Sequence, residues 1–140
     1  MDVTVSAGYL GLAAGALALA FAYYFFGRVR RYETGTERMQ EIANAIQEGA
    51  MAFLRREYRS LSIFVILMVV IIFLAGTLTS GPGSMEPTTA IAFLLGALTS
   101  GLAGYIGMRA ATQANVRTAN AARTGGMVEA LGVAFSGGAI

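Results

Sequence analysis

The sequence contains no cysteine, histidine, tryptophan or lysine, and only two prolines. Without cysteine and histidine, the chain has no disulfide, no thiol nucleophile, no histidine general base and no zinc site built on those residues. Charge is also scarce, at 13% of residues, and the net charge is +2 because ten arginines face eight acidic residues. The arginines form no basic tail or patch with interleaved aromatic residues, so we expect no nucleic-acid partner. No phosphate-binding loop of the form G-x-x-x-x-G-K-[ST] is present either.

What the sequence has in abundance is apolar side chains, which make up 56% of the residues and give a mean hydropathy of +0.62. Uncharged stretches cover residues 3–27, 60–79 and 88–108, and each is long enough to cross the roughly 30 Å hydrocarbon layer. A fourth apolar stretch, residues 127–140, would reach only about 21 Å at about 1.5 Å per residue. An unfinished span leaves backbone groups unsatisfied in lipid, so we expect a piece of a longer protein. The fold class predicted is all-α, a polytopic transmembrane helix bundle in one region over residues 1–140, with three full spans and the start of a fourth.

The distribution of arginine predicts how the helices are oriented. Every arginine falls in one of two segments, residues 28–59 or 109–123, and positively charged loops face the cytosol. The N-terminus and the loop 80–87, which carries only Glu86, are therefore expected outside. The ten arginines are at positions 28, 30, 31, 38, 55, 56, 59, 109, 117 and 123.

Residues 37–59 form an amphipathic stretch that continues without a breaker into the apolar residues 60–79, which predicts one long helix that begins in water. Its glycines, Gly49 and Gly76, cost about 1 kcal/mol each relative to alanine, too little to break it. Gly49 lies beside the apolar stripe and could admit a neighbouring helix. The apolar stripe consists of Met39, Ile42, Ala43, Ile46, Ala50, Phe53 and Leu54, and the polar stripe of Glu37, Glu41, Asn44, Glu48, Arg55 and Arg59.

Small residues recur at four-residue steps in two of the predicted spans. Gly11 and Gly15 form one such pair, and Gly96, Ser100 and Gly104 continue the pattern along residues 88–108. Such a pattern could form a dimer seam, but ordinary packing inside one bundle is the interpretation we favour.

Few residues could carry chemistry, and we assign no catalytic, substrate-binding or metal-binding residue. Glu41 and Glu48 lie about 10.5 Å apart along the helix axis, too far to chelate one ion directly, and Glu37 and Glu41 belong to the solvated face. Glu129 is expected to cap the helix that it begins. The arginines of residues 55–59 and 109–123 could contact a phosphate-bearing ligand, but snorkelling to lipid headgroups is favoured. Four polar residues of the second segment are typical of turns and caps between helices: Asn115, Thr118, Asn120 and Thr124.

Two strings carry a family resemblance. The string IANAIQEGAMAFLRREY (residues 42–58) resembles a segment near the start of the membrane-integral inorganic pyrophosphatases, and GMRAATQANVRTANAAR (residues 107–123) resembles the cytosolic loop that follows in that family. Members are long single chains of about sixteen helices, so the resemblance implies that this chain corresponds to the first quarter, which supplies helices of the outer ring. The family's pyrophosphate-binding motif, with its DVGADLVGK-like core, is not present.

The resemblance implies part of a pump that couples hydrolysis of cytosolic pyrophosphate to export of H⁺ or Na⁺. It further implies Mg²⁺ as cofactor, K⁺ dependence in some subfamilies, a homodimer, and a bacterial or archaeal cell membrane, while the 140-residue chain alone is expected to be inactive. Two alternatives stay open, namely a complete small four-helix membrane transporter and an assembly or scaffold protein. A small exporter would need a buried binding acid, and the three full spans contain no charge.

Overall fold

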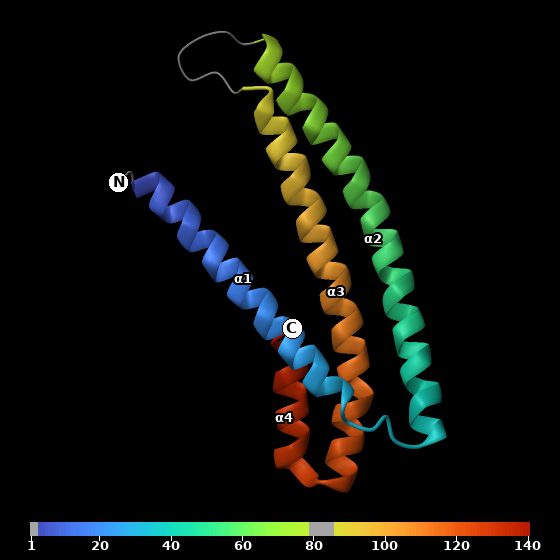
Figure 1. The fold of residues 1–140 in the computed structure, drawn as a ribbon. Helices are drawn as coiled ribbons and strands as arrows, with labels where there is room; N and C mark the ends of the chain where they lie inside the picture. Colours follow the sequence, from blue (N-terminus) through green and yellow to red (C-terminus); the bar gives the residue numbers. More distant parts are fainter. Residues whose placement is uncertain (1–2, 79–85) are drawn as a thin grey trace. The chain divides into compact units, whose positions relative to one another are not determined.

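The computed structural model describes the backbone of residues 3–78 and 86–140 and the side chains of residues 8–78 and 86–140. Within these ranges the chain forms four α-helices and no strand: α1 (Val3–Arg30), α2 (Glu37–Leu78), α3 (Thr88–Thr124) and α4 (Gly126–Gly138) (Figure 1). Three of them, α1, α2 and α3, are long and apolar enough to cross a membrane. The predicted all-α membrane fold is therefore confirmed. The loop predicted at residues 80–87 lies outside the described residues except for its last two.

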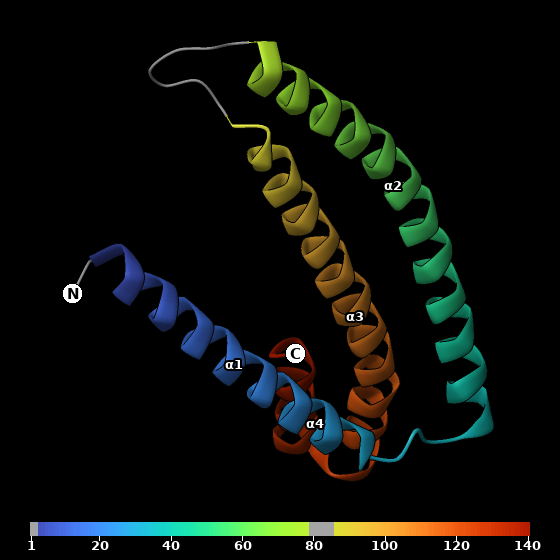
Figure 2. The same cartoon turned by 45° about the horizontal axis from the view of Figure 1, so that its top comes forward.

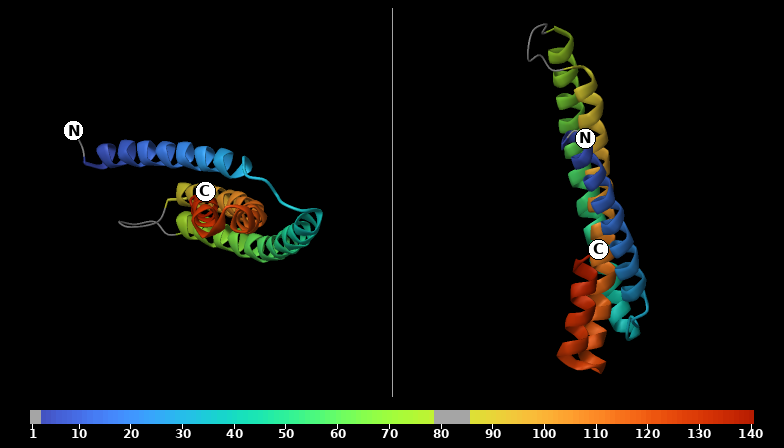
Figure 3. Two further views of the ribbon diagram at one scale, coloured as in Figure 1. Left: turned by 90° about the horizontal axis from the view of Figure 1, so that it is seen from below. Right: turned by 60° about the vertical axis from the view of Figure 1, so that its left-hand side comes forward.

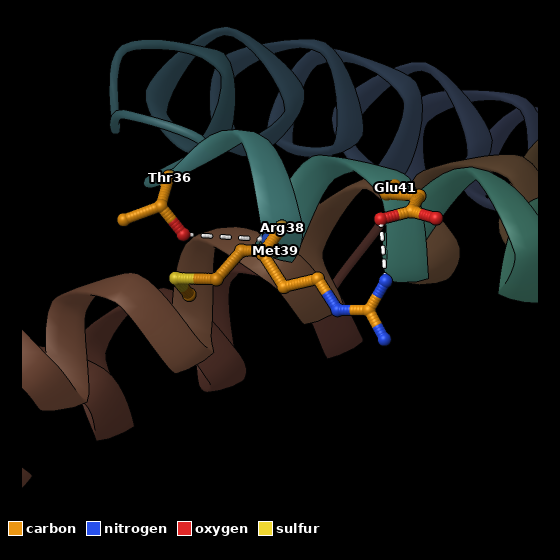
Figure 4. A network of polar contacts seen from close by, with 4 residues as sticks. All are labelled: Thr36, Arg38, Met39 and Glu41. Carbon is orange, nitrogen blue, oxygen red and sulfur yellow. Dashed lines mark hydrogen bonds and ion pairs between the residues drawn. The ribbon is translucent and has the colours of Figure 1, made fainter.

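Helix α2 is continuous, as the sequence predicted. It begins at a threonine cap, because the backbone N–H of Met39 donates to Oγ1 of Thr36 at 3.4 Å and the N–H of Gln40 donates to the Thr36 carbonyl at 3.0 Å (Figure 4). Neither Gly49 nor Gly76 interrupts it over its 42 residues.

Helix α3 extends further than the sequence predicted. Residues 109–123 were expected to form a loop with Asn115, Thr118 and Asn120 as turn or cap formers, and that prediction was wrong, because α3 continues to Thr124. Asparagine and threonine are only mildly unfavourable in a helix, and tertiary contacts override such preferences. The helix stops at two glycines, where Gly126 adopts φ +79°, a conformation that glycine accepts without strain.

The chain divides into two compact units, and α2 and α3 each contribute to both. Unit 1 comprises Met1–Gln47 and Arg109–Ile140. In it α4 turns back and lies beside the last turns of α3, and the C-terminal part of α1 contacts α4 (Figures 2 and 3).

The core of unit 1 is formed by Ala121, Ala130 and Val133, with Tyr32 packed against them. Small side chains let α3 and α4 approach closely: Gly137 lies so near Ala114 that a Cβ on the glycine would overlap the Cβ of the alanine.

Unit 2 comprises Glu48–Met108, the apolar part of α2 and the first part of α3. The Tyr58 hydroxyl donates a hydrogen bond to the Gly101 carbonyl at 2.6 Å. A Cβ at Gly104 would lie 3.0 Å from that hydroxyl, so the glycine makes room for the tyrosine. By contrast, apart from the neighbouring backbone of the same helix, no described atom lies within 4 Å of a Cβ built at Gly11, Gly15 or Gly96, so among the glycines of the pattern in the described residues close packing is seen at Gly104 alone.

Candidate functional site

The loop between α1 and α2 is held by two side chains of α3. Arg117 donates from Nε to the Tyr32 carbonyl at 3.2 Å, and Asn120 donates from Nδ2 to the Glu33 carbonyl at 3.3 Å. Gly35 completes the fit, since it adopts φ +78° and a Cβ there would lie 2.8 Å from Oδ1 of Asn120. Segments more than eighty residues apart in the sequence are therefore joined by side chain to backbone hydrogen bonds.

A polar cavity of about 190 Å³ lies beside this loop, within unit 1. Arg117 is partly buried at its edge and donates a second hydrogen bond, from Nη1 to the Gln113 carbonyl, at 2.7 Å. Burial, and secondarily the nearby charge of Arg30, lower the pKa of Arg117, although an arginine remains protonated at neutral pH. The cavity is lined by Arg31, Tyr32, Glu33, Arg117, Asn120, Ala121, Thr124 and Glu129.

An apolar groove of about 170 Å³ lies between the first turns of α2 and the last part of α3, also within unit 1. It uses four residues of the predicted apolar stripe, and two of them remain partly open: Ile42 is 49% exposed and Ile46 is 44% exposed. The packed face of this amphipathic segment is thus only half covered by the described residues. The groove is lined by Met39, Ile42, Ala43, Ile46, Thr112, Asn115, Val116 and Ala119.

The acidic residues that the structure describes lie apart from one another. Glu41 pairs with Arg38 at 2.6 Å, with both side chains exposed (Figure 4), and Glu37 and Glu48 are exposed as well, which confirms the solvated face. Glu129 lies in the first turn of α4, where the prediction of a cap placed it near the favourable end of the helix dipole, and its carboxylate folds back over Gly125 without accepting a hydrogen bond from the described residues. Across residues 8–78 and 86–140, no three acidic side chains come close enough together to hold a metal ion.

The arginines differ in what they contact. Arg55, Arg56 and Arg59 are exposed along α2, and their contact with lipid headgroups stays a prediction. Arg117 instead holds the loop, and Arg123 donates from Nη2 to Oδ1 of Asn120 at 3.0 Å.

Sequence reasoning did not predict that the polar side chains of α3 would hold the α1–α2 loop. It assigned Asn120, which is only 4% exposed, to a turn. The signal that could have found it is the i, i+3, i+4, i+7 spacing of Arg117, Asn120, Ala121 and Thr124, which places all four on one helix face.

Three apolar membrane-length helices, with polar helix ends and loops, define a multi-pass integral membrane protein of the all-α class. The family model for inorganic H⁺ pyrophosphatase matches residues 16–140, so the chain belongs to that family. The resemblance of residues 42–58 and 107–123 is thereby confirmed.

Curated relatives include proteins with different transported ions. The chain is 44% identical over 128 residues to a K⁺-insensitive pyrophosphate-energized proton pump of Methanosarcina mazei, covering 91% of this chain and 18% of the relative. It is 44% identical over 128 residues to the K⁺-insensitive pyrophosphate-energized proton pump 2 of Moorella thermoacetica, covering 91% and 17%. It is 41% identical over 125 residues to the K⁺-stimulated pyrophosphate-energized sodium pump of Thermotoga maritima, covering 89% and 16%. The chain thus spans less than a fifth of the length of these relatives.

Proposed function

We propose that this chain is the N-terminal part of a pyrophosphate-energised ion pump, which couples hydrolysis of inorganic pyrophosphate to export of H⁺ or Na⁺. The observation that carries the proposal is the family match over residues 16–140, together with about two-fifths identity to pumps of both ion types. Because proton and sodium pumps match to a similar degree, the proposal leaves the transported ion and the K⁺ dependence to the remainder of the pump.

In this proposal the chain supplies helices that surround the catalytic centre and carries no catalytic group itself. Metal-assisted phosphoryl transfer needs clustered carboxylates and basic groups around the phosphates. The described residues offer no such cluster of acids, so Mg²⁺ and pyrophosphate would bind elsewhere in the pump. The purified 140-residue chain, given magnesium and pyrophosphate in lipid, is expected to release no phosphate above a membrane-only blank.

The proposal includes a topology and an assembly state. The N-terminus faces out, both arginine-bearing segments face the cytosol of a bacterial or archaeal cell, and the pump is a homodimer. The distribution of arginine supports the orientation, since positive charge is retained on the cytosolic side.

A chimaera tests the proposed function directly. In the Thermotoga maritima sodium pump, the segment aligned with this chain would be replaced by residues 16–140. Pyrophosphate hydrolysis and pyrophosphate-dependent Na⁺ uptake would then be measured in inverted vesicles. We expect both activities to be retained, and the chimaera to transport the ion of the recipient pump.

Two controls make the outcome decisive. A recipient that lacks the segment should be inactive, which shows that the segment is needed. A chimaera with an unrelated three-span membrane segment should also be inactive, which shows that lipid anchoring alone does not suffice. If the chimaera reaches the membrane in normal amount but neither hydrolyses pyrophosphate nor transports Na⁺, the proposal is wrong.

A further inference from the structure

The polar cavity of unit 1 contains charged groups that are not paired with one another. In the described parts of the chain, the guanidinium of Arg31 makes no hydrogen bond or ion pair, and neither do the carboxylates of Glu33 and Glu129. Arg117 uses two of its five N–H donors on backbone carbonyls and so remains able to bind a further acceptor. The cavity therefore presents hydrogen-bond donors that no described side chain satisfies.

The surroundings favour an anion. Arg30 lies close enough to Arg117 for their charges to repel, so Arg30, Arg31 and Arg117 place three positive charges in and beside the cavity against two negative ones. The carboxylate of Glu129 is folded over the first turn of α4, where the helix dipole offsets its charge. Like charges held together in this way are stabilised by a shared anionic partner.

The position of the cavity and the chemistry of arginine indicate which anion it can bind. Its lining residues Arg31 to Glu33 follow the last residue of α1, four residues beyond the aromatic group Tyr23 to Phe26, and its lining residues on α3 come nine to sixteen residues after the uncharged stretch 88–108. The cavity therefore lies beyond the ends of both apolar segments, on the side where the arginines gather. Guanidinium groups bind phosphate through a planar fork of two N–H donors, and phosphate groups occur both in lipid headgroups and in soluble compounds.

We propose that this cavity is a phosphate-binding site in which Arg31 and Arg117 hold the phosphate of a membrane lipid or of a soluble phosphate compound. Arg31 is the side chain free to close on the ligand, whereas Arg117 also holds the α1–α2 loop. The site depends only on the geometry of unit 1 and does not require that the chain be part of a pump.

Binding would be measured on the purified 140-residue chain in a sugar-headed detergent by ³¹P NMR line broadening. One arm titrates short-chain phosphatidylglycerol and the other inorganic phosphate, both at constant ionic strength set with chloride. Binding in the first arm alone identifies a lipid site, and binding in the second identifies a site for soluble phosphate. Either result supports the proposal, provided that it depends on Arg31.

Three variants establish that dependence. Arg31→Gln should raise the Kd about tenfold, the usual loss for one charge-assisted pair. Glu33→Gln should lower the Kd, since it removes a repelling charge. Arg38→Gln is the matched control, because it removes the same charge from an arginine already paired with Glu41 outside the cavity, and it should leave the Kd within about twofold.

The proposal is overturned if neither titrant binds, or if Arg31→Gln and Arg38→Gln weaken binding equally, which would mean general charge attraction. Circular dichroism of each variant shows whether the helices are intact, and within the described residues Arg31 makes no side-chain hydrogen bond or ion pair whose loss would weaken them.

Discussion

Gly137 is the residue at which the close approach of α3 and α4 depends most directly on the absence of a side chain. Its missing Cβ leaves room for the Cβ of Ala114, and both residues are buried. Gly137→Ala should therefore destabilise unit 1 by about 1–3 kcal/mol through overpacking. The measurement is the thermal unfolding midpoint by far-UV circular dichroism. Gly132→Ala is the control on the same helix, with open space around the new methyl group, and it should leave the midpoint unchanged or raise it slightly. Equal midpoints for the two variants would contradict the packing of α4 on α3.

Asn120 satisfies a loop carbonyl from a nearly buried position. Asn120→Ala removes the donor to Glu33 and the acceptor for Arg123, with an expected loss of about 1–3 kcal/mol. Because the loop is then released, trypsin should cleave faster after Arg31. Asn115 is exposed on the same helix, and trypsin should cleave the Asn115→Ala variant at the wild-type rate. Unchanged cleavage in the Asn120 variant would mean that the hydrogen bond does not restrain the loop.

At the level of helix pairs, Tyr58 links the two halves of unit 2. Tyr58→Phe should cost about 1 kcal/mol, and Gly104→Ala should cost a similar amount because its methyl group meets the tyrosine hydroxyl at 3.0 Å. If the alanine at position 104 destabilises the protein only by its steric overlap with that hydroxyl, it should have almost no effect on stability when Tyr58 is replaced by phenylalanine. A double-mutant cycle on thermal stability measures this coupling. Additive effects would show that the glycine is needed for another reason.

The surroundings of Gly49 are open in the described part of this chain. The sequence suggested that a helix could pack there, yet no described atom lies within 4 Å of a Cβ at this position. Gly49→Leu should therefore leave the thermal midpoint of the 140-residue chain unchanged. Gly49→Ala should stabilise α2 by about 0.5–1 kcal/mol. In the full-length chimaera, the leucine should lower the thermal midpoint if a further helix of the pump covers this face. Loss of stability already in the short chain would mean that a second copy covers it.

For the molecule as a whole, orientation is the property that charge alone predicts. Because the chain has no cysteine, single cysteines at Ala45 and Ser84 give clean labelling with an impermeant thiol reagent in right-side-out vesicles. Ala45 is exposed on the polar part of α2, and its substitution leaves the Thr36 cap intact. Ser84 should be labelled and Ala45 should be protected until the membrane is permeabilised. The reverse pattern would contradict the proposed topology.

The parts of the fold that could be predicted from the sequence follow from hydropathy, which is local. The apolar runs identified the three long helices, and the lack of breakers identified α2 as continuous. The helical state of residues 109–123 and the role of Asn120 could not be predicted in this way, because both depend on contacts with residues 32–33, far away in the chain. The same limit applies to Gly137, whose partner Ala114 belongs to another helix and has no distinguishing pattern of its own.

Within unit 1, helix α1 packs against α4 near its own C-terminal end. Val29 is 1% exposed, whereas Leu10, Leu12, Leu17 and Leu19 are each more than 60% exposed. Where only fluid acyl chains surround those leucines, exchanging one for isoleucine, valine or phenylalanine leaves the fit unchanged, since lipid adapts to any apolar outline. Where a second helix lies against them, the same exchanges would be selected against one by one. The pattern of substitutions that natural or mutagenised populations accept along α1 therefore reports whether its neighbour is lipid or protein.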